Sequence, residues 1–442
     1  MSKKSILKGT LILTIAGIAT KLLGFYNRIF LTRLIGVKEL GIYQLIFPMY
    51  LLAFSICCQG IATTLTKQVS YYIGKKCPDD AKKVFRYSLG LSFCLSIAVS
   101  IQLNLLAYPV CLYILKNTDC TQLLKIITLA IPFVCIKACI NSYFVGIDKP
   151  GYQGASHFIE QIFRIGTAYI LAAFWTADKL NARLAVISVV AGEICATALA
   201  IIIYKYHVFK TKKTAANVNI TTNTDCSDSI MKSLLRDAVP ITVNNVMFTL
   251  FSSLEAILMP AMLFYYYNDS DIAMEMFGIV TGIVVPFLLF PSTITTSLST
   301  MLLPAVSYAN ARHDRRAIKS ALTNSILFCL MLGACAWLFY QIFGEFACRI
   351  AFESETAGTL LKKMSFMCPL IYLSGNLSAI MNGLDKAFQN LMYNIISIVI
   401  RILFSVTLVP TMGLTAYIYG MAASYIVLDV LLLMSVKKKQ QN

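Results

Sequence analysis

The chain has 442 residues, of which 58% are hydrophobic and only 13% are charged, and its mean hydropathy is +0.71. A soluble protein of this length could not cover its surface with so few charged side chains, so the composition excludes one and indicates an integral membrane protein. The formal net charge of +17 would suit a nucleic acid or a lipid surface, and its distribution along the chain decides between them.

Long apolar runs dominate the sequence, and runs of about 18 to 25 residues can cross a bilayer as single helices. About twelve such runs occur, about six before residue 207 and six after residue 232. We therefore predict an all-α integral membrane protein with about twelve transmembrane helices. In chain order the runs are 9–34, 41–66, 85–111, 123–145, 154–177, 184–206, 237–266, 277–304, 318–343, 360–383, 387–410 and 413–435.

The first predicted helix, 9–34, carries two cations away from its ends. Lys21 and Arg28 lie seven residues apart and therefore on one face, Gly24 opens space between them, and the helix holds no acidic residue. Ionisable side chains at membrane depth usually face a cavity or a partner. Two cations on one face suit a phosphate or pyrophosphate, so we predict that Lys21 and Arg28 bind the substrate. A salt bridge to another helix, or snorkelling toward the membrane surface, stays open for both.

The fifth predicted helix, 154–177, offers an ion pair of its own. Glu160 and Arg164 lie four residues apart with the acid first, which is the favourable order on a helix. Arg164 has a counterpart 237 residues later, Arg401, in the eleventh predicted helix. A residue kept in both halves is more often structural, so we predict that Glu160, Arg164 and Arg401 anchor the helices. Contact of the two arginines with the substrate stays open.

A polar stretch from about Lys205 to Lys232 separates the two halves of the chain. It is rich in Asn, Thr and Ser after a basic start, which is typical of a flexible cytoplasmic linker. We predict an N-terminal six-helix lobe at 1–206, a linker at 207–232, a C-terminal six-helix lobe at 233–435 and a basic tail at 436–442.

The seventh predicted helix, 237–266, presents a polar stripe. Asn245, Ser252 and Glu255 stand on it together with two threonines, at spacings of three and four residues. We predict that these three residues line the substrate pathway. Glu255 is expected to pair with Lys21 or Arg28 when the pathway is empty, or else to couple transport to a cation, with H⁺ and Na⁺ both left open.

The eighth predicted helix, 277–304, is rich in hydroxyl-bearing residues and prolines. Pro286, Pro291 and Pro304 can bend or break it, as a gating helix requires. The hydroxyls often bond their own backbone instead, so each one is a weak sign of function.

Landmarks of the first half recur in the second half at a fixed offset of 237 residues. Pro132, Gly146, Asp148, Lys149 and Arg164 recur as Pro369, Gly383, Asp385, Lys386 and Arg401. The shared register predicts a duplicated six-helix unit, and an even number of helices gives both copies the same orientation. The repeat fails at Arg28, whose counterpart is Tyr265, so we expect function to lie where the repeat fails.

The distribution of Lys and Arg predicts an orientation in the membrane. With a cytoplasmic N-terminus, 24 of the 38 basic residues fall on the cytoplasmic side, nine fall outside and five fall inside helices. The positive-inside rule therefore predicts a multi-pass protein of the cell membrane with both termini in the cytoplasm. This pattern favours membrane lipids as partners and excludes a nucleic acid.

The sequence holds no motif of an enzyme or of a metal site. A Ser-His-Asp arrangement, a nucleotide-binding loop, HExxH and paired C-x-x-C spacings are all missing. The 14 cysteines scatter through predicted helices, where they are best interpreted as small packing residues. We therefore expect no enzyme, no metal and no cofactor, and a monomer.

Three segments resemble a known family: KLLGFYNRIFLTRLIGVKELGIYQLIFP, SHFIEQIFRI and GIVTGIVVPFLLFPSTITTSLSTMLLPAVSYA. They are similar to the stage V sporulation protein B group, in the polysaccharide-exporter branch of the multidrug/oligosaccharidyl-lipid/polysaccharide (MOP) flippase superfamily. The resemblance covers nearly the whole chain. It implies a MATE/MOP-like fold and export of undecaprenyl-pyrophosphate-linked oligosaccharide or peptidoglycan precursor by alternating access. It also implies that Lys21 and Arg28 serve the diphosphate.

Two other functions stay open. A cation-coupled multidrug antiporter of the same fold would need deep acidic residues, for which Glu160, Glu193 and Glu255 are available. A membrane glycosyltransferase or polymerase would need acidic or metal-binding residues in sizeable outer loops, and the loops carry only scattered acids such as Asp269 and Asp271. Sporulation, vegetative wall and capsule synthesis cannot be told apart from the sequence.

Overall fold

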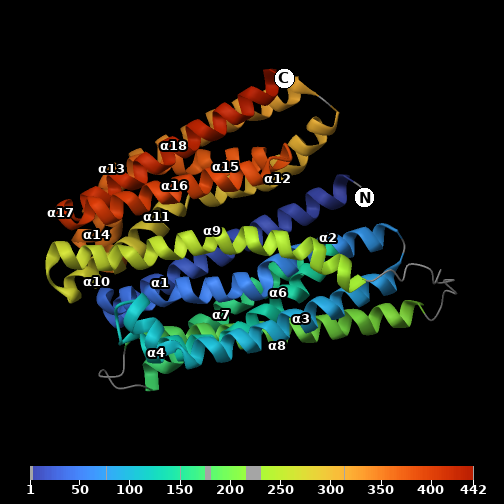
Figure 1. Cartoon of the computed structure of the whole chain (residues 1–442), viewed down its shortest axis with the longest axis horizontal. Coiled ribbons are helices and arrows are strands. Elements are labelled where there is room, and N and C mark those ends of the chain that lie inside the picture. Colours follow the sequence, from blue (N-terminus) through green and yellow to red (C-terminus); the bar gives the residue numbers. More distant parts are fainter. Residues whose placement is uncertain are drawn as a thin grey trace. The chain divides into compact units, whose positions relative to one another are not determined.

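The computed structural model describes residues 3–75, 77–149, 151–174, 181–215, 230–312 and 314–441. Within these ranges the chain is helical apart from turns and short connections (Figure 1). The predicted all-α class is thereby confirmed. The elements before the chain midpoint are α1 (Lys3–Phe54), η1 (Ser55–Gln59), α2 (Gly60–Gly74), α3 (Pro78–Leu105), α4 (Ala107–Pro109), η2 (Val110–Ile114), α5 (Cys120–Thr128), α6 (Ala130–Gly146), α7 (Gly151–Phe174) and α8 (Ala182–Ala215).

The second half contains helices of similar length. They are α9 (Ile230–Tyr267), α10 (Ser270–Gly278), η4 (Ile279–Val284), α11 (Val285–Leu289), α12 (Ser292–Ala311), α13 (Arg315–Phe352), α14 (Glu355–Met364), η5 (Ser365–Met367), α15 (Cys368–Gly383), α16 (Ala387–Thr407), α17 (Val409–Met412) and α18 (Leu414–Gln441).

Ten helical stretches of the described chain are long and apolar enough to cross a membrane. The first, Gly17–Gly74, has 58 residues and contains residues 17–34 of the first predicted helix and all of the second, 41–66. Gly36 separates them with φ 80° and ψ 170°, a backbone conformation that glycine adopts without a Cβ penalty. The fifth predicted helix coincides with α7, although residues 175–177 lie outside the described residues. The total of about twelve stays a prediction.

The predicted eighth helix, 277–304, differs in the structure. The helix starts earlier, at Ser270, and is interrupted at Phe290 and Pro291 before α12 begins. Phe290 itself keeps helical backbone angles, with φ −62° and ψ −51°. Pro291 has no backbone N–H to donate to the preceding turn, which accounts for the break. Pro286 lies in the first turn of α11, where its missing N–H costs little.

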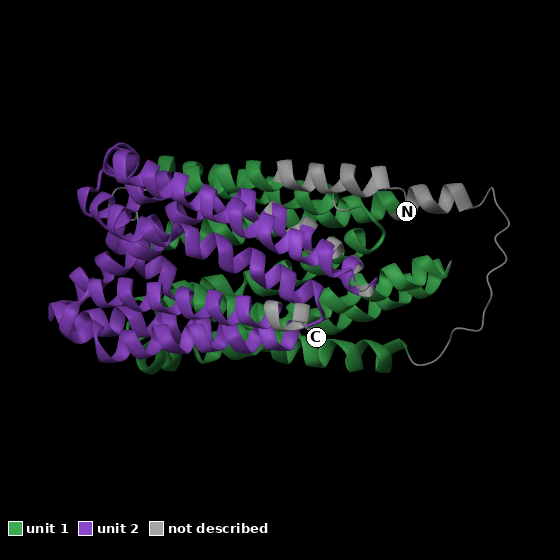
Figure 2. Ribbon diagram, turned by 90° about the horizontal axis from the view of Figure 1, so that it is seen from above, with its two compact units in different colours: residues 1–27, 46–250 green, residues 28–45, 251–442 purple. Residues whose placement is uncertain are grey.

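The chain forms two compact units, coloured separately in Figure 2. Unit 1 consists of residues 1–27 and 46–250, and unit 2 of residues 28–45 and 251–442. Each unit therefore takes residues from both halves of the sequence. The lobes 1–206 and 233–435 and the tail 436–442 stay predictions. So does the linker 207–232, of which residues 216–229 lie outside the described chain.

Within unit 2, the second part of α1 packs closely against α10 and η4. A Cβ added to Gly41 would meet the backbone of Met274, and one added to Gly278 would meet the backbones of Val37 and Gly41. Glycine at both positions lets the two helix backbones approach.

Candidate functional site

Unit 1 contains a cavity of about 710 Å³. Its walls come from the end of α1 and from η1, α2, α6 and α7, with Glu193 contributed by α8. The lining includes amide and hydroxyl side chains as well as charged ones, together with the aromatic rings of Tyr50 and Phe54. The amide and hydroxyl residues are Gln59, Thr63, Thr66, Asn141, Ser142 and Gln153.

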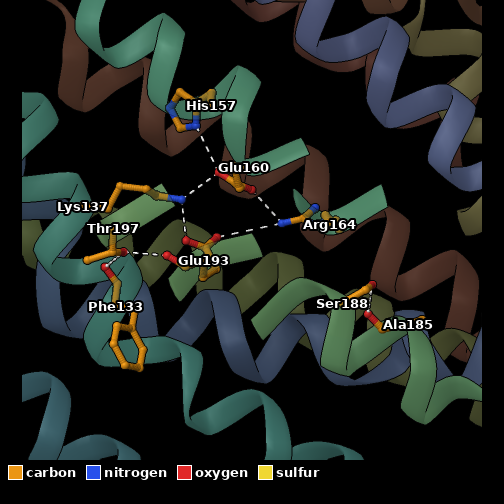
Figure 3. A network of polar contacts seen from close by, with 9 residues as sticks. All are labelled: Phe133, Lys137, His157, Glu160, Arg164, Ala185, Ser188, Glu193 and Thr197. Carbon is orange, nitrogen blue, oxygen red and sulfur yellow. Dashed lines mark hydrogen bonds and ion pairs between the residues drawn. The ribbon is translucent and has the colours of Figure 1, made fainter. Parts of the chain in front are cut away.

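A network of charged side chains contributes to the wall of this cavity through Lys137, His157, Glu160 and Glu193 (Figure 3). Lys137 Nζ donates to Glu160 Oε2 at 2.7 Å and also to Glu193 Oε2. Arg164 Nη2 donates to the other oxygen of Glu160 at 2.7 Å and lies 3.9 Å from Glu193 Oε1. His157 Nδ1 lies 3.4 Å from Glu160 Oε2. Two acids and two bases from α6, α7 and α8 thus share one cluster.

Burial makes this cluster energetically demanding. Lys137 is only 3% exposed, Glu160 7% and Glu193 4%. A buried charge is tolerated only when it is paired and hydrogen-bonded, and here each carboxylate contacts both bases. Thr197 helps to hold α8 in place, because its hydroxyl donates to the carbonyls of Glu193 and of Phe133.

The sequence indicated only part of this network. The ion pair between Glu160 and Arg164 is present on α7 at the expected spacing. Lys137 was not predicted, and Glu193 was named only as an acid available to an antiporter. Lys137 is the one charged residue of α6 and Glu193 the one acid of α8, and neither has a polar stripe around it. The presence of such rare charges within apolar helices was itself a usable signal, because charged residues inside a membrane usually pair with one another.

The two cations predicted to bind phosphate lie in different units. Arg28 belongs to unit 2, where its Nη1 donates to the carbonyls of Thr281 at 3.1 Å and Gly282 at 3.0 Å. Both acceptors belong to η4, a π-helix, and such local deviations are frequent at functional sites. Lys21 belongs to unit 1 and is exposed on α1. Phosphate binding by either residue stays a prediction.

Glu255 has a different partner from those expected. It is 7% exposed, and Arg401 Nη2 lies 3.2 Å from its Oε2 within unit 2. The predicted pairing with Lys21 or Arg28 is therefore replaced by a pair between α9 and α16. A buried carboxylate needs a base held within reach, and Arg401, itself packed over the Tyr425 ring, provides one.

The other two residues of the predicted stripe on α9 are half-buried. Asn245 belongs to unit 1, whereas Ser252 belongs to unit 2, because the division between the units passes through this helix. Their role in lining a substrate pathway stays a prediction.

One further acid was missed by the sequence. Asp429 on α18 is 4% exposed, and among the described residues neither of its carboxyl oxygens has a hydrogen-bond partner. An ionisable residue within a membrane helix is by default a candidate for function. Metal binding has no support in the described chain, where His, Cys, Asp and Glu form no group of three or more suited to an ion.

Comparison with known proteins gives a family match over most of the chain. A family model described as polysaccharide biosynthesis protein matches residues 6–307. Stage V sporulation protein B of Bacillus subtilis is 25% identical, over 99% of this chain and 85% of that protein. The lipid II flippase MurJ of the same organism is 21% identical, over 96% of this chain and 81% of that protein. The resemblance drawn from the three sequence segments is thereby confirmed.

Solved structures match the fold. The outward-facing conformation of a multidrug resistance MATE family transporter of the MOP superfamily matches with a TM-score of 0.72 at 14% identity, covering 99% of this chain and 96% of that one. A MOP superfamily transporter from Pyrococcus furiosus, described by the reverse polarity of its binding pocket, matches with a TM-score of 0.70 at 16% identity. This match also covers 99% of this chain and 96% of that one. The MATE/MOP-like fold is therefore confirmed, and the 237-residue repeat stays a prediction.

Proposed function

This chain belongs to the polysaccharide biosynthesis protein family, and from that membership we propose that it flips a lipid-linked oligosaccharide across the cell membrane. It is a multi-pass membrane protein with the MOP fold and a transporter rather than an enzyme. The proposed cargo is a sugar carried on undecaprenyl pyrophosphate, including peptidoglycan precursors. The names of two relatives, a stage V sporulation protein and a lipid II flippase, support wall or spore-cortex synthesis as the destination.

The cavity of unit 1 is the observation that carries this proposal. Its volume of about 710 Å³ lies within the usual range of small-molecule sites, about 300–1,000 Å³. Sugars offer many hydroxyl groups, which the amide and hydroxyl side chains of the wall would satisfy. Tyr50 and Phe54 would cover the apolar face of a sugar ring, so the cavity suits the carbohydrate part of the cargo.

The remaining site residues enter the proposal by their chemistry. Lys21 and Arg28 would hold the phosphates, since Lys and Arg side chains are the usual protein partners of phosphate groups. Asn245 and Ser252 would line the route, and Glu255 would reset the site through its pair with Arg401. The protein would act as a monomer with both termini in the cytoplasm, with coupling to H⁺ or Na⁺ left open.

The test is a flipping assay in proteoliposomes with a fluorescently labelled lipid-linked oligosaccharide. Ala138→Phe would fill the cavity from α6, whereas the matched Ala98→Phe adds the same ring at an exposed position of α3. We expect the wild type and Ala98→Phe to move the lipid and Ala138→Phe to lose most of the rate. No movement of any lipid-linked sugar by the folded wild type would refute the proposal. Equal rates for all three would refute the role of the cavity.

A cation-coupled multidrug antiporter is the alternative, because the fold also serves multidrug transporters. Such a protein needs a carboxylate available to a coupling ion. Glu160, Glu193 and Glu255 are all paired with basic side chains, which favours the flippase. Drug efflux that depends on Glu255 would favour the antiporter instead.

A further inference from the structure

A second cavity lies between α3, α6 and α8 in unit 1 and shares no lining residue with the first. Its volume is about 500 Å³ and its wall is almost entirely apolar. Phe85 and Tyr204 close one end, with ring centroids 4.7 Å apart, and Phe93 lies at the other end of the α3 wall. Gly90 leaves this wall open, because a Cβ added there would meet no heavy atom within 4 Å.

Two cations stand at the aromatic end of this cavity. Arg86 follows Phe85 on α3, and Lys205 follows Tyr204 on α8. Both are exposed, and within the described chain neither forms a salt bridge. Their neighbours on α3 behave differently, since Lys82 pairs with Asp79 at 2.8 Å and Lys83 with Asp80 at 2.9 Å. Within the part of the chain that the structure describes, no acid forms a salt bridge with either of these two positive charges.

Both cations lie at the end of an apolar stretch, and the apolar wall runs inward from them. α3 starts at Pro78, eight residues before Arg86. α8 continues to Ala215, but its apolar run ends at Lys205, and Lys210, Lys212 and Lys213 follow in the sequence. From Arg86 to Phe93 the wall extends over seven residues, which is about 10 Å of helix. A charged end at the edge of a span and an apolar depth behind it is the arrangement of a phospholipid: head group outside and chain inside.

We propose that this cavity is a binding site for an anionic phospholipid of the bilayer. Part of one acyl chain fills the apolar cavity, and the phosphate lies between Arg86 and Lys205. Basic pockets between transmembrane helices bind anionic head groups in this manner. The short apolar depth suits part of an acyl chain better than the long polyprenyl chain of a lipid-linked sugar. The site does not depend on the proposed flippase function, since it lies apart from the cavity that carries that function.

The test compares lipid binding to the purified full-length protein by native mass spectrometry, with phosphatidylglycerol and phosphatidylcholine as probes. The wild type is expected to retain phosphatidylglycerol in preference to phosphatidylcholine. The double variant Arg86→Gln/Lys205→Gln is expected to lose about tenfold in phosphatidylglycerol affinity. Lys82→Gln/Lys83→Gln removes two paired cations of the same helix and is expected to bind like the wild type.

A second pair of variants tests the apolar part of the site. Gly90→Leu places a side chain in the cavity from a position where an added Cβ meets no heavy atom within 4 Å, and Gly375→Leu makes the same change at an equally open position of unit 2. Only Gly90→Leu is expected to reduce retention. Equal retention of the two lipids, unchanged binding by Arg86→Gln/Lys205→Gln, or retention of undecaprenyl phosphate in place of phosphatidylglycerol would each overturn the proposal.

Discussion

Asp148 and Asp385 adopt the same left-handed backbone conformation, with φ of 62° and 60°. Each lies in a turn closed by the same pattern of three backbone hydrogen bonds. In each turn the residue before the aspartate, the aspartate and the following lysine donate to carbonyls four, three and five residues earlier. The two residues are 237 apart (385 − 148), as are Lys116 and Glu353 (353 − 116), which also have positive φ. At Asp148 and Asp385 the two segments thus have the same local backbone structure, while the 237-residue repeat itself stays a prediction.

The first prediction concerns these turns. Aspartate and asparagine tolerate the left-handed region, whereas a β-branched residue is strained there by about 1–2 kcal/mol. We expect Asp148→Val and Asp385→Val each to lower the midpoint of thermal unfolding in detergent, and Asp148→Asn and Asp385→Asn to leave it nearly unchanged. Valine variants as stable as the asparagine variants would show that the turns carry no such constraint.

The second prediction concerns Lys137, which contacts both buried carboxylates of unit 1. Lys137→Met leaves Glu160 with Arg164 and His157, and Glu193 with Arg164 alone, within the network; breaking a buried pair typically costs about 3–5 kcal/mol. We expect a large loss of thermal stability, measured by fluorescence-detected size exclusion after heating.

The matched control for Lys137 restores the charge balance. Lys137→Met/Glu193→Gln removes one base and one acid, so the pair of Glu160 and Arg164 remains neutral overall. The double variant is expected to be more stable than Lys137→Met alone. The single variant Glu193→Gln completes the comparison. If the stability lost by the double variant equals the sum of the losses in Lys137→Met and Glu193→Gln, the network is contradicted.

The third prediction concerns the pair of Glu255 and Arg401. Both side chains are largely buried, so Glu255→Gln and Arg401→Gln should each destabilise unit 2 by leaving a charge without its partner. In a double-mutant cycle we expect a coupling of about 0.5–3 kcal/mol. Additive single effects, with no coupling, would mean that the two residues do not interact in solution.

The fourth prediction concerns Asp429, whose carboxyl oxygens have no hydrogen-bond partner among the described residues. An unsatisfied buried polar group costs about 1–3 kcal/mol, so Asp429→Leu is expected to raise thermal stability by that order. If transport is lost in this more stable variant, the acid serves function. A less stable Asp429→Leu protein would show that the carboxyl group has a stabilising partner after all.

The helices and the family could be recognised from the sequence because both depend on local patterns. Apolar run length predicts a membrane helix, and a spacing of four residues predicts the pair of Glu160 and Arg164. The partners of Arg28 and Glu255 could not be predicted in this way. Thr281 offers a backbone carbonyl, which every residue has, so no sequence pattern marks it as a partner for Arg28. Which base reaches Glu255 depends on how helices distant in sequence pack.

The backbone connects the two units more than once, because residues 28–45 belong to unit 2 and residues 230–250 belong to unit 1. The backbone passes from one unit to the other after residues 27, 45 and 250, so three covalent crossings join them. The predicted linker 207–232 is not one of these crossings, because it lies within the range of unit 1. A protease cut within residues 207–232 would yield two fragments, each of which contains part of both units. Neither unit could then be isolated by cleaving the chain at its most polar stretch, and the two fragments would be expected to purify together.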